Sequence, residues 1–147
     1  MSDTEAILTA LRSRYLAYRE KVEEVERSSK PAAGLLGLKG GVKDDPCHDA
    51  FAEDLRVLLA DFAAAEPDSA AVSRVLRFMF RYPLENPKPS CAYWMLLAVQ
   101  TLAQDLIELL TPEDAAALAA EYKRDYPRRM RFPAQEQLLK KLKRRAG

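Results

Sequence analysis

The sequence predicts an all-α protein of about six helices. Apolar residues recur at spacings of three and four along most of the chain, whereas no segment alternates as a half-buried strand would. Capping residues followed by proline, as in Asp45-Pro46 and Thr111-Pro112, are typical of helix starts. With 147 residues, 48% of them apolar and 31% charged, we expect a single globular domain over residues 1–147.

The first predicted helix, residues 1–29, is long and begins with the capping-box pattern Ser2 to Glu5. Its apolar positions form a seam of heptad type: Leu8, Leu11, Tyr15, Tyr18, Val22 and Val25. Such a seam fits a helix that lies along its own domain, and it also fits a homodimer joined through residues 8–25. The sequence leaves both interpretations open.

Residues 30–45 are predicted to form a glycine-rich loop, because four of the five glycines lie in the stretch KPAAGLLGLKGGVK. Its leucines indicate that the loop packs down onto the domain. A phosphate-binding loop is not favoured, since no Gly-Lys-Ser/Thr follows and Asp44 and Asp45 stand where a phosphate would sit.

Five further helices are expected from caps, prolines and apolar spacing. The second has Asp45 as N-cap, the third has Asp68 or Ser69 and stops at Tyr82-Pro83, and the last begins at Pro133. They are predicted at residues 46–66, 69–83, 90–110, 112–126 and 133–145.

A near-repeat with an offset of 44 residues runs through the middle of the chain. The matched pairs are Cys47 with Cys91, Phe51 with Met95, Leu55 with Val99, Leu58 with Leu102, Phe62 with Leu106, and Tyr82-Pro83 with Tyr126-Pro127. The offset predicts two pseudo-repeated αα-hairpins, 46–83 and 90–127, that stack in the manner of armadillo or HEAT repeats. Chance matching of two amphipathic helices is the alternative.

The segment KDDPCHDAFAED holds the chain's one histidine and one of its two cysteines. We interpret it as the capped start of a core helix, because Cys47 falls on the apolar stripe and no metal-ligand spacing accompanies it. The alternatives are a metal site formed by Asp45, Cys47, His48 and Cys91, or a small metal- or thiol-dependent enzyme centred on Cys47, His48 and Asp49. No cofactor is predicted.

The sequence also indicates the cellular compartment of the protein. The N-terminus lacks the apolar core of a signal peptide, and the longest apolar run, residues 91–99, is too short to span a bilayer. Two cysteines in this setting are expected to be thiols rather than a disulfide framework. We therefore expect a cytoplasmic protein with no membrane span.

Basic residues gather at the C-terminus. Residues 123–147 hold ten basic and two acidic residues, and since the chain has 23 and 22 in all, the remainder holds 13 and 20. Such asymmetry is typical of proteins that bind polyanions, although a solvated surface gives the same pattern. The candidate partner-binding residues are Arg128, Arg129, Arg131, Lys140, Lys141, Lys143, Arg144 and Arg145.

These observations predict a non-catalytic interaction or scaffold domain whose partner is an acidic protein or a nucleic acid. Phe132 is the one aromatic residue interleaved with the basic ones, and no recognition helix is evident, so sequence-specific reading is not predicted. Arg74, Arg77 and Arg81 share one face of the third helix, where we expect them to be solvated or paired to glutamates of the first helix.

Overall fold

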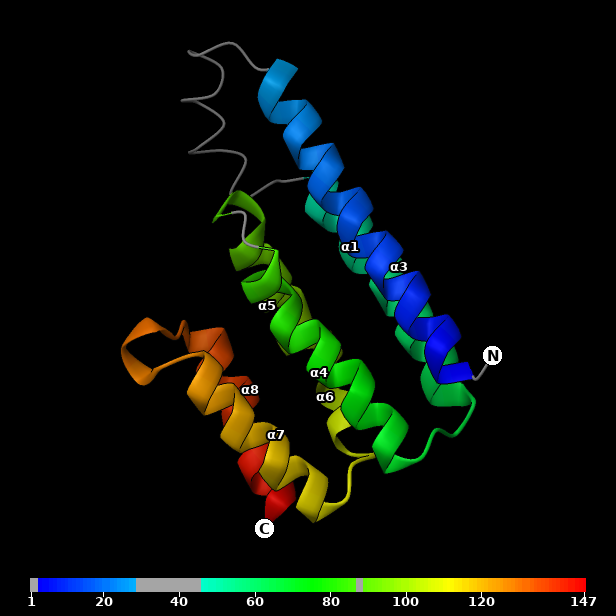
Figure 1. Ribbon diagram of the computed structural model, residues 1–147, viewed down its shortest axis with the longest axis vertical. Helices are drawn as coiled ribbons and strands as arrows, with labels where there is room; N and C mark the ends of the chain where they lie inside the picture. Colours follow the sequence, from blue (N-terminus) through cyan, green and yellow to red (C-terminus); the bar gives the residue numbers. More distant parts are fainter. Residues whose placement is uncertain (1–2, 29–45, 87–88) are drawn as a thin grey trace.

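The computed structural model describes residues 3–28, 46–86 and 89–147, and every element within these ranges is a helix (Figure 1). The predicted loop at 30–45 and the predicted N-cap Asp45 lie outside the described residues. The helices are α1 (Asp3–Ser28), α3 (Pro46–Ala64), α4 (Ser69–Glu85), α5 (Pro89–Leu102), α6 (Gln104–Ile107), α7 (Pro112–Asp125), the 3₁₀ turn η1 (Arg128–Met130) and α8 (Pro133–Ala146). The all-α prediction is confirmed.

The helices run up and down in three neighbouring pairs, with α1 and α3 on one side, α4 and α5 in the middle, and α7 and α8 on the other (Figure 1). The packing is most extensive between α7 and α8 and between α1 and α3, whereas α4 and α5 pack on α7 and α8, respectively, at least as extensively as on each other. The predicted hairpins 46–83 and 90–127 instead join helices of adjacent pairs. Their boundaries therefore do not coincide with the pairs that pack most closely, and the proposed repeat stacking stays a prediction.

The seam of α1 packs inside its own chain. Leu11, Tyr15, Tyr18 and Val22 are buried in the core, and the Tyr18 ring stacks on that of Phe51 with centroids 4.4 Å apart. Stacked and edge-to-face aromatic pairs add to the stabilisation that burial alone provides. The outer end of the seam differs, since Val25 is 45% exposed.

Two helix starts agree with the capping expectations. The Asp68 carboxylate accepts a hydrogen bond of 2.8 Å from the backbone N–H of Ala71, and the Thr111 hydroxyl accepts one of 3.2 Å from that of Asp114. Each side chain satisfies one of the N–H groups that a helix start leaves without an intrahelical partner.

The end of α4 was predicted wrongly. The helix continues through Pro83 to Glu85, and the N–H of Asn86 closes its last turn on the carbonyl of Tyr82 at 2.9 Å. Pro83 is buried within the helix. A proline removes one backbone donor from a helix, but α4 tolerates this loss one turn before its end.

The predicted helix 90–110 is divided into α5 and α6. The break is at Ala103, and the side-chain amide of Gln104 donates a hydrogen bond of 2.8 Å to the carbonyl of Gln100. This carbonyl is the one that the Gln104 backbone N–H would take in a continuous helix. The side chain thus competes with the backbone for its own helical acceptor.

Candidate functional site

The C-terminal basic residues are positioned by a short connection between α7 and α8. Tyr126 caps the end of α7, residues 128–130 form the turn η1, and Pro133 opens α8. The backbone N–H of Phe132 donates to the side-chain oxygen of Gln135 at 2.9 Å, which fixes the start of α8. The basic residues therefore project from two places, the turn η1 and the solvent side of α8.

Three of the eight predicted partner-binding residues are engaged within the chain. Arg131, whose side chain is 8% exposed, contacts Glu136 at 2.6 Å and donates to the carbonyl of Tyr126 at 3.2 Å. Lys141 pairs with Glu108 at 2.5 Å, and Nε of Arg145 donates to the carbonyl of Leu110 at 2.7 Å. The Lys141 ammonium holds the pKa of the Glu108 carboxyl below its ordinary value. These three side chains stabilise the two ends of α8.

The other five predicted residues are exposed, and none forms an ion pair with a carboxylate in the described part of the chain. They are Arg128, Arg129, Lys140, Lys143 and Arg144. We call these five the open basic residues. Arg144 acts on the Glu108 carboxyl only at longer range, as one of the charges that lower its pKa.

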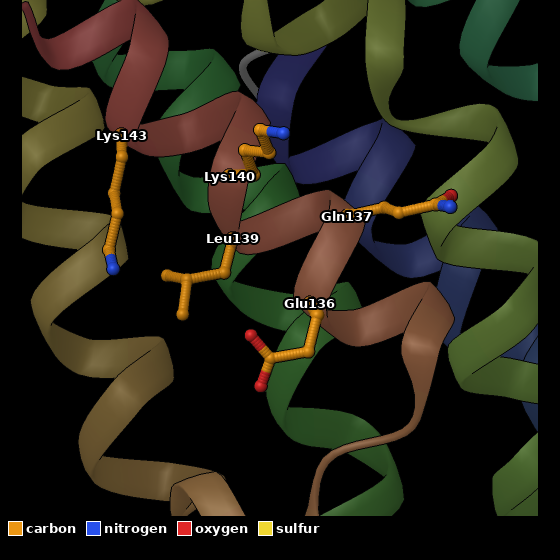
Figure 2. A pocket seen from close by; sticks show the side chains of 5 residues that line it. All are labelled: Glu136, Gln137, Leu139, Lys140 and Lys143. Atoms are coloured by element: carbon orange, nitrogen blue, oxygen red, sulfur yellow. The ribbon is translucent and has the colours of Figure 1, made fainter.

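Two open depressions lie among the open basic residues. One, of about 550 Å³, is lined by Pro127, Arg128 and Arg129. The other, of about 320 Å³, lies on α8, and Figure 2 shows Leu139 and Lys143 extending from one side of the helix and Gln137 from the other. Both are shallow surfaces suited to an extended partner rather than enclosed cavities for a small molecule.

Sequence reasoning missed the aromatic side chains beside these residues. Tyr93 of α5 contacts Phe132 at a centroid distance of 5.1 Å and Trp94 at 5.2 Å. Tyr93 and Phe132 are 39 residues apart in the sequence, so no local pattern could have paired them. The structure thus adds aromatic rings to a region that the sequence predicted as basic with a single aromatic residue.

The arginine face of α4 pairs differently from the expectation. Arg74 contacts Glu5 of the first helix, as predicted, but Arg77 makes two contacts to Glu121 of α7, at 2.7 and 3.0 Å. Hydrogen bonding to Arg77 lowers the pKa of the Glu121 carboxyl. Arg81 lies 3.8 Å from Asp125 of α7. The face mainly joins α4 to α7.

The predicted alternative site around the histidine is only partly described. Cys47 and His48 are half-buried on α3, Asp49 is exposed, and Cys91 is buried on α5. The His48 ring lies 4.5 Å from that of Trp94. Asp45 is outside the described residues, and within the described ranges no group of three or more His, Cys, Asp or Glu residues is arranged to hold a metal ion.

Fold and surface together define a class: an all-helical bundle, over the described residues, with exposed basic side chains on its last turn and last helix. No family model matches the chain, and comparisons with curated proteins and with solved structures gave no significant match. Among the described helices, none is both long and apolar enough to cross a membrane.

Proposed function

We propose that this protein is a non-catalytic interaction domain that binds an acidic or polyanionic partner through its open basic residues. The observation that carries the proposal is that basic residues with a partner in the chain lie beside basic residues without an ion pair. Lys141, Arg145 and Arg131 each have an acceptor within the chain, whereas their neighbours Lys140, Lys143 and Arg144 form no ion pair in the described ranges.

Uncompensated charges of one sign have two consequences. They repel one another in the free protein, and they attract a partner of opposite charge over about the Debye length, roughly 8 Å at physiological ionic strength. The five open basic residues are also presented on regular elements, η1 and α8, so their positions are held by the fold. A partner that neutralises them would remove the repulsion.

The setting we propose is a reducing compartment such as the cytoplasm, because Cys47 and Cys91 are both thiols. A second copy of the chain is one acidic partner that the proposal admits. Pairing through residues 8–25 has less support, since four side chains of that seam are buried within one chain, Leu8 is half-buried, and Val25 at its far end is 45% exposed.

The proposal is tested with two polyanions of different chemistry, inorganic polyphosphate and polyglutamate. We expect native protein to bind at least one of them, and the variant Arg128→Gln/Arg129→Gln to bind it more weakly. The matched control is Arg14→Gln/Lys21→Gln, which removes the same charge from exposed positions on α1. Equal weakening by both variants, or no binding of either polyanion by native protein at low salt, would contradict the proposal.

A further inference from the structure

Three aromatic rings form a row on the surface beside the open basic residues. The Tyr93 ring lies at the centre, with Phe132 at 5.1 Å and an interplanar angle of 76°, and Trp94 at 5.2 Å and 79°. Tyr93 is 39% exposed and Phe132 38% exposed, and Trp94 is half-buried. The row connects α5 to the start of α8.

Arg128 and Arg129 stand next to this row along the chain. Phe132 is three positions after Arg129, which limits the separation of their Cα atoms to about 11 Å. Both arginines line the open depression of about 550 Å³ at η1. Arg129 and Phe132 are therefore close enough along the chain for one extended ligand to span both. We call Tyr93, Phe132, Arg128 and Arg129 the aromatic–arginine patch.

Packing alone accounts for only part of this arrangement. Edge-to-face ring pairs add stabilisation beyond burial, which explains why Tyr93 of α5 and Phe132 at the start of α8 contact each other. It does not explain why both rings keep more than a third of their surface exposed beside two arginines without carboxylate partners. Exposed apolar surface grouped with uncompensated charge is typical of a binding site.

We propose that the aromatic–arginine patch binds single-stranded nucleic acid, with bases stacked on Tyr93 and Phe132 and phosphates held by Arg128 and Arg129. This inference rests on the proposed function and names its partner. Aromatic platforms beside a basic groove are the common solution for binding single strands, because every unpaired base offers a planar face. In a duplex those faces are covered by neighbouring base pairs, so double strands cannot use the rings in this way.

The competing partner is an acidic protein. A carboxylate-rich segment would satisfy the arginines, but it has no planar surface that would use the two exposed rings. Nucleic acid is therefore the partner that uses both parts of the patch. Binding is expected to tolerate different sequences, because stacking and phosphate contacts do not read the edges of the bases.

Trp94, the only tryptophan of the chain, gives a direct optical test. It lies against Tyr93, so a base stacked on that ring should change its fluorescence. The first experiment titrates native protein with an unlabelled oligothymidylate of about 12 nucleotides, a length within the range bound by compact domains. We expect saturable quenching that weakens with salt, and weaker binding of a duplex of the same length.

The second experiment compares variants by fluorescence anisotropy of the labelled oligonucleotide. Tyr93→Leu and Phe132→Leu keep apolar volume but remove the ring, and each is expected to weaken binding by roughly 5-fold or more. Tyr93→Phe keeps the ring and should bind like native protein. Leu109→Ala, at another exposed apolar position, should also leave binding unchanged and serves as the control.

The outcomes separate the two proposals. If the oligonucleotide binds but both leucine variants match native protein, or if the duplex binds equally well, the stacking inference is overturned while the basic surface stands. If polyphosphate or polyglutamate binds and the oligonucleotide does not, the inference fails and the proposed function survives. If none of these polyanions binds at low salt, both fail.

Discussion

The hydroxyl of Tyr126 donates a buried hydrogen bond of 2.5 Å to the backbone carbonyl of Phe80. Tyr126 ends α7, and Phe80 lies in α4 three residues before Pro83. The N–H that Pro83 lacks would serve the carbonyl of Met79, so the Tyr126 hydroxyl does not replace it but adds a hydrogen bond between α7 and α4 at the next carbonyl. The bond fixes the end of α7, from which η1 and its two arginines begin.

Replacing Tyr126 by Phe removes this hydroxyl and keeps the ring. We expect the free energy of unfolding to fall by about 1 kcal/mol, because a buried carbonyl then loses a hydrogen bond. Urea denaturation followed by circular dichroism would measure the change. Tyr93→Phe, at an exposed ring, should lie within about 0.5 kcal/mol of native protein, and an equal loss in both variants would contradict the role given to Tyr126.

Buried tyrosines make the fold sensitive to high pH. Burial raises the pKa of Tyr122 to about 12, and it raises the pKa of Tyr15 and Tyr126 above the ordinary value of 10.0 as well. Because the folded-state pKa is raised, the unfolded chain loses its tyrosine protons at lower pH than the folded protein does. The contribution of these tyrosines to the free energy of unfolding is therefore fully present below pH 10.0, the ordinary value, and is lost as pH rises through the folded-state pKa. We therefore expect the melting temperature to fall between about pH 10 and pH 12. A constant melting temperature across that window would show that these hydroxyls are not shielded.

The pair of Arg77 and Glu121 joins α4 to α7 and is partly exposed, with side-chain exposures of 38% and 25%. Solvent screening limits its contribution, so we expect a coupling free energy of about 0.5–1 kcal/mol from a double-mutant cycle with Arg77→Ala and Glu121→Ala. Because the pKa of Glu121 is lowered in the folded state, this contribution is present above its unfolded value of 4.5 and is lost as pH falls below it. Coupling that persists after Glu121 is protonated would contradict the assignment.

Neighbouring arginines on α8 should behave in opposite ways. Arg145 donates to the carbonyl of Leu110, so Arg145→Ala is expected to lower the free energy of unfolding by about 1 kcal/mol. Arg144 is an open basic residue, so Arg144→Ala should leave stability within about 0.5 kcal/mol and weaken polyanion binding instead. Thermal denaturation would measure the stability of both variants, and a titration would measure their affinity for polyphosphate. A loss of stability in Arg144→Ala, or a loss of affinity without a loss of stability in Arg145→Ala, would contradict this expectation.

Local signals gave most of the fold, and their failures have physical causes. The caps Asp68 and Thr111 were predictable because capping depends on a few adjacent residues. The two Tyr-Pro corners differ: Tyr126-Pro127 ends α7 as predicted, whereas α4 continues through Pro83 because the Asn86 N–H still closes on Tyr82. The break at Ala103 depends on a side-chain hydrogen bond of Gln104, which helical periodicity does not reveal.

The sequence predicted where the basic residues of the candidate site lie in the chain, but not which groups they contact in the folded protein. Composition located the basic C-terminus, but it could not tell Arg145, whose acceptor is 35 residues away, from Arg144 beside it. Likewise the contact of Tyr93 with Phe132 exists only after α5 and the start of α8 have packed. The tertiary structure determines which basic side chains lack an ion-pair partner and which aromatic rings lie near them.

The salt dependence of polyphosphate binding tests the central claim most directly. Affinity would be measured for native protein, for Arg128→Gln/Arg129→Gln and for the control Arg14→Gln/Lys21→Gln over a series of salt concentrations. If the open basic residues bind the polyanion, native affinity falls steeply with salt, and the slope becomes shallower in the first variant alone, because fewer counterions are then released. A slope that is the same in all three proteins would contradict the claim.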